Sequence, residues 1–398
     1  MNKKIILSII VLLIFSVSIY SSTVKIWAMG EEAKQLGKIA SVFEEQNPDI
    51  TIDVQAIPWD NAYDKLLTGI AARRLPDIAQ MGTTWMAGFG AMGVFEELTP
   101  YIEKSDIITE DHFFDASWQT VSLQDGIYGI PWYVDVRVMF YRTDLLKEAG
   151  YDKAPDNWEE LYEVSKKLAE REGNYGISLM TNEVQQFFPF VWQNGGRILD
   201  DEGNIVVDSP EFIEAIEYYA RFFKEDISPK GGGGNIIQEF ASGYTPIYFS
   251  GPWMVSLTKQ QTPQIDGKWD VALMPKKKSR TSFIGGSNWV LFNTSKNKDD
   301  AWKFIEFMSS HDTQLEWYNI LASLPAVKSV WDEPALAEKP MISLFGEQLE
   351  DARAPLTIPE YEEIASAISR RLEEACYGVK TPEEAALAMK RDIEKILR

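Results

Sequence analysis

The segment Gly126–Leu146 gathers residue types that could bind a polar, ring-shaped ligand. Its sequence, GIYGIPWYVDVRVMFYRTDLL, places aromatic rings beside acidic and basic side chains. Apolar residues alternate with Asp135 and Arg137, which predicts an extended strand with both charged side chains on the same side. A pyranose sugar needs flat aromatic faces for its C–H surface and hydrogen-bonding partners for its hydroxyls. The alternative is an edge strand with one face in water.

Other aromatic residues occur beside polar residues at the ends of predicted strands. In open α/β sheets, ligands bind beyond the carboxyl ends of the strands, in loops positioned by the sheet. Core packing is the commoner role of a single Trp, but the recurrence of this pattern favours binding. The segments are Trp27–Glu31, Gln80–Trp85, Thr181–Trp192, Gly251–Trp253 and Gly285–Trp289.

Motifs for catalysis are missing from the sequence. His112 and His311 do not have the spacing of a metal site or a catalytic triad, and Cys376 has no His nearby. Neither Gly231–Gly234 nor Gly285–Ser287 follows a phosphate-loop pattern. We therefore expect no catalytic residue, no metal and no cofactor. A carboxylate pair for glycoside hydrolysis stays open, because the chain has 60 acidic residues and no motif selects two of them.

The composition limits the partners of the chain. A net charge of −21 argues against binding to nucleic acid or to an anionic membrane surface, and weakly against an anionic substrate. The length of 398 residues exceeds one ordinary core and indicates two domains. The single cysteine excludes an intramolecular disulfide.

The N-terminal segment MNKKIILSIIVLLIFSVSIYSS has the layout of a secretory signal peptide. Two lysines precede an apolar run that is shorter than the roughly 20 residues of a spanning helix, and small residues follow it. We expect residues 1–22 to be a leader and the remaining chain to be soluble in the periplasm.

Strand and helix patterns alternate after this leader. Strands at Thr23–Trp27, Ile50–Ile57 and Pro76–Ala79 flank helices at Glu31–Gln46 and Asn61–Arg74, which predicts a parallel sheet covered by helices. The chain ends in two predicted helices. They are Tyr361–Tyr377 and Pro382–Leu397, the second beginning at Thr381 with Glu384 placed to complete a capping box.

Several segments, in this order and spacing, resemble the sugar-specific solute-binding proteins of bacterial ABC importers, the family that includes the maltose-binding protein. The resemblance covers nearly the whole chain from Val24 to Leu397. It rests on Phe43–Gln55, Leu75–Met81, Gly126–Trp132, Tyr141–Gly150, Ala154–Leu161, Ser250–Trp253 and Gly285–Trp289.

The resemblance implies an α/β, periplasmic-binding-protein-like fold with two lobes, each a central sheet flanked by helices, and a ligand cleft between them. Lobe 1 would comprise residues 23–131 and 275–326, and lobe 2 residues 132–274 and 327–398. The chain would cross between the lobes near Pro131–Asp135, Lys268–Pro275 and Leu324–Val330.

The resemblance, together with the motifs, also yields the candidate ligand-binding residues. They are Glu31, Thr84, Trp85, Asp135, Arg137, Glu183, Gln185, Trp253, Gly286, Asn288, Trp289, Arg353 and Tyr361. The sequence departs from the maltose-binding pattern after the strand at Pro76–Ala79. Met81 replaces a Trp of maltose-binding relatives, and Thr84 and Trp85 replace an Asp and an Arg. The sequence therefore favours the sugar class without selecting maltose.

The leading hypothesis is a monomeric substrate-binding component of an ABC sugar importer. It would bind a neutral mono- or oligosaccharide by hinge closure and deliver it to the permease subunits. One alternative is an exported glycoside hydrolase acting on oligosaccharides. Another is a binding module for a peptide, an amine or an anion on the same fold.

Overall fold

A computed structural model describes residues 21–123, 126–231 and 234–398 of the chain. The expected leader lies outside these residues except for Ser21 and Ser22. Ser22 begins strand β1 (Ser22–Met29), and its hydroxyl donates a hydrogen bond of 2.7 Å to Asp300. Ser22 is thus part of the folded first lobe, one residue before the expected start of the mature chain.

The first lobe is built on a mixed sheet with the strand order β11-β6-β10-β3-β1-β2. Strand β1 is parallel to β2 and β3, whereas β10 is antiparallel to β3 and β6. A separate hairpin, β4 (Ser122–Leu123) with β5 (Gly126–Ile127), accompanies this sheet. The other strands are β2 (Ile50–Ile57), β3 (Ile78–Gly82), β6 (Ile130–Val136), β10 (Ser282–Leu291), β11 (Leu324–Pro325) and β12 (Ala352–Arg353), the last paired with β10.

Helices on both sides of this sheet bury their apolar stripes against it. In α1 (Gly30–Gln46) the buried residues Ala33, Leu36, Ala40 and Phe43 recur at helical spacing, as expected for an amphipathic helix. The remaining helices of this part are α2 (Trp59–Ala72), α3 (Met86–Ala91), α4 (Thr99–Ile102), α5 (Asp115–Gln119), α12 (Lys298–Met308), α13 (His311–Leu321), α14 (Pro334–Ala337) and α15 (Pro340–Leu349), with 3-10 turns at Thr83–Trp85, Glu110–His112 and Lys328–Asp332.

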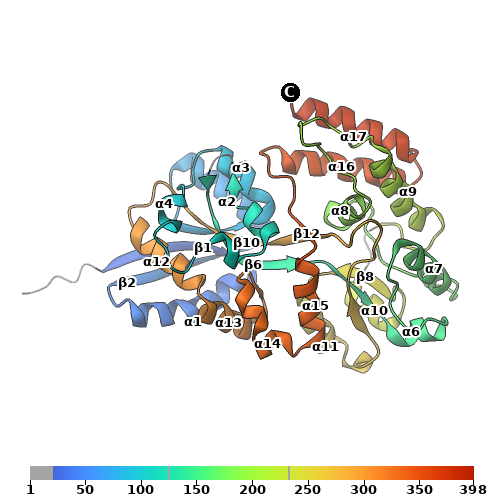
Figure 1. Cartoon of the computed structure of the whole chain (residues 1–398), viewed down its shortest axis with the longest axis horizontal. Helices are drawn as coiled ribbons and strands as arrows, with labels where there is room; N and C mark the ends of the chain where they lie inside the picture. Colours follow the sequence, from blue (N-terminus) through green and yellow to red (C-terminus); the bar gives the residue numbers. More distant parts are fainter. Residues whose placement is uncertain (1–20, 124–125, 232–233) are drawn as a thin grey trace, which may run out of the picture.

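The second lobe contains a smaller antiparallel sheet with the order β8-β7-β9. Helices cover both of its faces (Figure 1). Its strands are β7 (Val138–Tyr141), β8 (Ile247–Ser250) and β9 (Asp270–Ala272). Its helices are α6 (Thr143–Glu148), α7 (Trp158–Ala169), α8 (Val184–Gln193), α9 (Pro210–Lys224), α10 (Ile236–Ser242), α11 (Trp253–Gln261), α16 (Tyr361–Cys376) and α17 (Pro382–Ile396), with a 3-10 turn at Pro263–Ile265.

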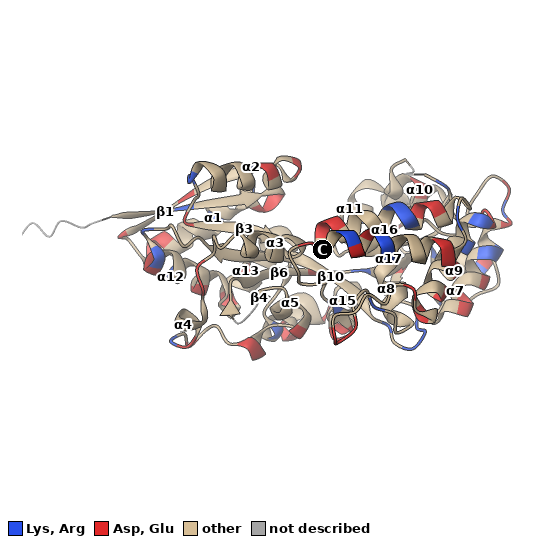
Figure 2. Ribbon diagram, turned by 90° about the horizontal axis from the view of Figure 1, so that it is seen from above, with Lys and Arg blue, Asp and Glu red and all other residues tan. Residues whose placement is uncertain are grey.

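The predicted α/β class with two lobes is confirmed by this arrangement. The capping box is confirmed too, because the Thr381 side chain accepts from the Glu384 N–H and the Glu384 carboxylate accepts from the Thr381 N–H. The single strand expected around Asp135 is divided into β6 and β7, which belong to different sheets. Figure 2 marks the positions of Lys, Arg, Asp and Glu, which are distributed over helices and loops of both lobes.

The chain passes between the sheets at three places. Arg137 connects β6 of the first sheet to β7 of the second, and residues 273–281 connect β9 back to β10. The third connection begins after β11, whose Pro325 pairs with Tyr133 of β6. Helix α15 packs against β6, β9 and β10, and its Phe345 ring lies 6.4 Å from Phe140. Leu356 and Ile358 are partly buried against the hydrophobic core under α8 and α9, and Tyr361 is buried within it.

The expected boundary of the second lobe at residue 327 stays a prediction, because α15 packs against strands of both sheets. Apolar residues between 327 and 354, among them Val330 and Leu349, belong to the same buried cluster as the first sheet. That cluster also includes Phe140 and Tyr248 on one face of the smaller sheet, whereas Met139 and Phe249 on its other face belong to the second cluster.

Candidate functional site

A cavity of about 310 Å³ lies between the lobes and contains several candidate residues. We call it the Trp253 cavity. The first lobe contributes the start of α1, strand β6 and the segment after α13, and the second lobe contributes α11. The lining residues are Glu31, Glu32, Tyr133, Val134, Asp135, Pro252, Trp253, Ser256, Leu257, Leu321, Ala322, Ser323 and Leu324.

The turn between β8 and α11 presents the Trp253 ring to this cavity. The ring lies across Gly251, where an added Cβ would be only 2.0 Å from a ring carbon, so a larger residue would displace the indole. Trp253 remains 41% exposed, which is unusual for a residue of this size; among the described tryptophans only Trp59, at 37%, is comparably exposed. The Gly-Pro-Trp turn therefore keeps an aromatic face available to a ligand.

Asp135, Arg137 and Gln185 form a polar cluster beside that ring. The Arg137 guanidinium donates to Asp135 at 2.5 Å and to the Gln185 side-chain oxygen at 3.0 Å. Its Cζ atom lies 4.9 Å from the centre of the Trp253 ring, within the range of a cation–π contact. The expectation that Asp135 and Arg137 project to the same side is confirmed by this ion pair. Because the two charges offset each other, the cluster suits a neutral, hydroxyl-rich ligand.

Two glutamates at the start of α1 face the same cavity. Gly30 turns the chain from β1 into α1 with a φ of +64°, a conformation that glycine adopts at little cost. Glu31 is exposed and accepts hydrogen bonds from Lys34 and Gln35, which lower its pKa. Burial raises the pKa of Glu32, and the negative charges of Glu31 and Asp135 add to this effect.

Sequence reasoning missed Glu32 and Tyr133. The signal for Glu32 was its position beside Glu31 in the first turn of the helix. Tyr133 was visible in the strand pattern, two residues before Asp135 and therefore on the same side of the strand.

The Tyr133 hydroxyl is held in a hydrogen-bond network that leaves its own proton available. It accepts from the Gln80 amide at 3.2 Å and from the Ser287 hydroxyl at 3.1 Å. The orientation of the Gln80 amide is set by Met29, whose backbone N–H donates to the Gln80 oxygen at 2.7 Å. Burial raises the pKa of Tyr133 far above its usual value, so the phenol stays protonated. Among the described residues no acceptor takes this proton, and the phenol can donate to a ligand in the cavity.

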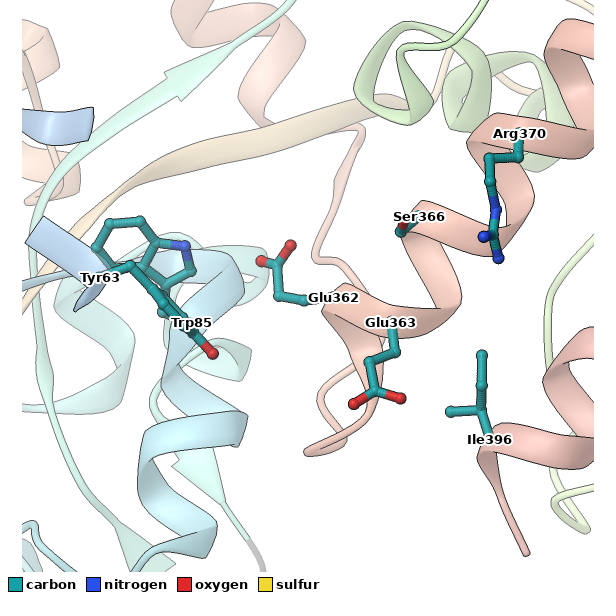
Figure 3. Close-up of a pocket in the computed structure, with 7 residues that line it drawn as sticks. All are labelled: Tyr63, Trp85, Glu362, Glu363, Ser366, Arg370 and Ile396. Carbon is teal, nitrogen blue, oxygen red and sulfur yellow. The ribbon is translucent and has the colours of Figure 1, made fainter. Parts of the chain in front are cut away.

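A second cavity of about 590 Å³ separates the first lobe from α16. We call it the Trp85 cavity. Its lining residues are Tyr63, Trp85, Glu362, Glu363, Ser366, Arg370 and Ile396. Figure 3 shows the Trp85 and Tyr63 rings on one side and Glu362 opposite them. The two rings pack edge to face at 5.4 Å, which holds the Trp85 indole in place.

Thr84 and Glu183 lie close to the Trp85 cavity. Burial raises the pKa of Glu362, a hydrogen bond with Thr84 opposes this shift, and the charge of Glu183 adds to it. Glu183 is the N-cap of α8, where its carboxylate accepts from the Gln185 N–H at 3.0 Å. The cap fixes the end of the helix from which Gln185 reaches Arg137.

Gly286, Asn288 and Trp289 are not among the lining residues of these two cavities, and their contact with a ligand stays a prediction. Gly286 has a φ of +115°, and an added Cβ would be 2.2 Å from the Tyr133 carbonyl oxygen, so its role is in the backbone. Asn288 is 1% exposed and donates to the Thr120 hydroxyl at 3.1 Å. Trp289 is fully buried and stacks on Trp132 with ring centres 4.0 Å apart.

Arg353 and Tyr361 line a third cavity of about 220 Å³, which shares no lining residue with the other two. We call it the Arg353 cavity. The described part of the chain contains no cluster of His, Cys, Asp and Glu placed to hold a metal ion. Cys376 is buried, and burial raises its pKa to about 12, so the thiol is a poor nucleophile. Within the same described ranges, no helix is both long and apolar enough to cross a bilayer.

Comparison with known proteins assigns a family. Residues 24–315 match the model of the bacterial extracellular solute-binding proteins. A putative binding protein of Brucella abortus is 27% identical over 87% of this chain and 85% of its own length. The galactooligosaccharide-binding protein of Bacillus subtilis is 23% identical over 92% of this chain and 87% of its own.

Solved structures agree with this match. The sugar-binding protein MalE of Xanthomonas citri superposes with a TM-score of 0.89 at 35% identity and covers 94% of this chain and 97% of its own. MalE3 of Thermotoga maritima, solved with maltose, has a TM-score of 0.81 at 26% identity. The match covers 94% of this chain and 99% of MalE3. The chain therefore belongs to the bacterial extracellular solute-binding proteins.

Proposed function

We propose that this protein binds a neutral mono- or oligosaccharide between its lobes and delivers it intact to the permease of an ABC importer. Relatives named for galactooligosaccharide, arabinooligosaccharide and lactose binding support the sugar class. A signal peptide at residues 1–22 would export the chain to the periplasm, where it would act as a monomer without cofactor or catalysis.

The observation that carries this proposal is the Asp135–Arg137–Gln185 cluster beside the half-exposed Trp253 ring. The ring offers an apolar face to the C–H side of a sugar, and the cluster offers donors and acceptors to its hydroxyls. A ligand that lacks one of these hydroxyls leaves a partly buried polar group unpaired, which costs about 1–3 kcal/mol. This cost would provide the discrimination between sugars.

The position of the cluster supports a hinge mechanism. Arg137 is the residue at which the chain passes from the first sheet to the second, and the Trp253 cavity is lined by both lobes. A sugar can contact both walls at once only when the lobes are closed. Binding would therefore shift the population toward the closed form, as in other two-lobed binding proteins.

Small-angle X-ray scattering combined with titration calorimetry tests the proposal. The ligand panel contains maltose, lactose, tagatose, galactooligosaccharides and arabinooligosaccharides, with amino acids and phosphate as non-sugar controls. We expect at least one saccharide to bind and to reduce the radius of gyration. Compaction by an amino acid, or no response to any saccharide in a broad panel, would contradict the proposal.

An assay for reducing ends tests the absence of catalysis. Purified protein incubated with each oligosaccharide should release no new reducing ends, because the acidic residues of the Trp253 cavity are proposed to bind hydroxyls rather than to transfer protons. Sustained release that increases with protein concentration would instead support the glycoside hydrolase.

Replacement of Tyr133 by phenylalanine should weaken binding of the highest-affinity saccharide in that panel. We expect Kd to rise about 3- to 10-fold, because one neutral hydrogen bond to the ligand is lost. Titration calorimetry measures the change. Ser287→Ala is the matched control, since it removes a donor to the phenol without removing the phenol from the cavity. Equal affinity of wild type and Tyr133→Phe would show that the phenol does not contact the sugar.

A further inference from the structure

The Arg353 cavity differs in charge from the rest of this acidic protein. Its lining residues are Gln119, Phe188, Trp192, Arg197, Ile198, Leu199, Arg353, Ala354, Pro355, Leu356, Thr357 and Tyr361. Two of these are arginines, and none of the described residues that line it is Asp or Glu. In a chain with a net charge of −21, this is a local positive site.

Arg197 lies close enough to Arg353 to disfavour the charge of Arg353. Burial lowers the pKa of Arg353, the neighbouring Arg197 lowers it further, and the charge of Asp201 opposes the shift. Arg197 has a partner, since it forms a 2.6 Å ion pair with the exposed Asp201. The Arg353 guanidinium has no ion pair or hydrogen bond to any described side chain, and it lies 5.6 Å from the centre of the Trp192 ring. Its donors are therefore available to a ligand.

The Tyr361 hydroxyl is a second donor without a partner in the same cavity. Tyr361 is only 3% exposed, and its hydroxyl has no hydrogen-bond partner among the described residues. A buried hydroxyl without a partner is costly, so its position calls for an acceptor. Burial, with the charges of Glu362 and Glu183, raises the pKa of Tyr361 far above its usual value and keeps the phenol protonated.

We propose that the Arg353 cavity binds a small oxyanion, a phosphate or a carboxylate, held by Arg353 and Arg197 and by the Tyr361 hydroxyl. Guanidinium groups match the oxygen geometry of such anions and can form paired hydrogen bonds with them. An anion would offset the repulsion between the arginines and satisfy the phenol. A volume of about 220 Å³ accommodates a group of this size.

The site is independent of the proposed sugar site. It is bounded by α8, by the segment that leads from β12 into α16, and by Gln119 at the end of α5 (Figure 1). Gln119 belongs to the first lobe and α8 to the second, so residues of both lobes line the cavity. The anion could be free in solution or could be a substituent of a larger molecule.

Titration calorimetry with inorganic phosphate, in a phosphate-free buffer of constant ionic strength, tests the proposal. We expect saturable 1:1 binding by wild type. Arg353→Met should weaken phosphate binding at least 10-fold, and Tyr361→Phe should weaken it about 3- to 10-fold. Arg391→Met is the matched control, because Arg391 is an exposed arginine of α17 outside the cavity. This variant should bind phosphate as tightly as wild type.

Further ligands distinguish the source of the anion. Glucuronate that binds more tightly than both phosphate and acetate, with the same dependence on Arg353, would indicate a sugar-borne carboxylate. Tighter binding of phosphate than of glucuronate and acetate would indicate that the cavity binds the free phosphate ion. Absence of binding by all three anions, or equal phosphate binding by wild type and Arg353→Met, would overturn the proposal. Neither result would affect the sugar site, since neutral saccharides in the same assay report on that site separately.

Discussion

Trp253→Ala is expected to weaken saccharide binding by about 2 kcal/mol or more, which corresponds to about 30-fold or more in Kd. The indole is the largest apolar surface in the Trp253 cavity, and its truncation removes both the stacking face and the cation–π partner of Arg137. Titration calorimetry with the saccharide of highest affinity measures the loss. The fold should remain intact, because the ring is 41% exposed and contributes little to the core.

Tyr377→Ala provides the control for this prediction. Tyr377 is a similarly exposed aromatic residue, 47% exposed, at the end of α16 and absent from the residues lining the Trp253 cavity. Its removal should leave sugar affinity unchanged. Thermal unfolding of both variants should lie close to that of wild type. Unchanged affinity of Trp253→Ala would place the sugar elsewhere in the protein.

Trp289→Ala should act on stability instead of binding, with a loss of about 3–5 kcal/mol in the free energy of unfolding of the first lobe. Trp289 is fully buried, stacks on Trp132 and lies 6.1 Å from Phe304. Truncation leaves a cavity in a close-packed core, and the neighbouring rings can fill only part of it. Urea unfolding monitored by circular dichroism measures the change.

Trp289→Phe is the matched variant for this test. Phenylalanine keeps an aromatic ring against Trp132 and removes an indole N–H that has no hydrogen-bond partner among the described residues. Its loss of stability should therefore be clearly smaller than that of alanine. If Trp289→Ala instead unfolded like wild type but failed to bind sugar, the residue would belong to the ligand site and not to the core.

Local elements of this protein were predictable from sequence because their causes are local. Apolar spacing predicted α1, the Thr381 cap predicted the start of α17, and alternation predicted that Asp135 and Arg137 share a side. The boundary between the lobes was harder to predict from sequence. Residues 327–354 contain α14 and α15, and α15 contacts β6 and β10 of the first sheet as well as β9 of the second, so local sequence patterns do not assign it to one lobe.

The candidate site was predictable to the extent that it depends on motifs. Resemblance indicated Asp135, Gln185 and Trp253, the strand pattern indicated Arg137, and the structure brings these four together. The sequence could not separate Arg353 and Tyr361 from these four residues, because only the fold shows that Arg353 and Tyr361 line a different cavity.

The sequence by itself determined the order of strands and helices, the α/β class and the aromatic and charged inventory from which a sugar site can be built. Only the tertiary structure decided which of the 13 tryptophans can meet a ligand. Trp253 and Trp289 both follow glycine-containing motifs, yet one is 41% exposed and the other is fully buried. Exposure depends on neighbours far away in the chain, here Trp132 and Phe304 over Trp289, and no local pattern contains that information.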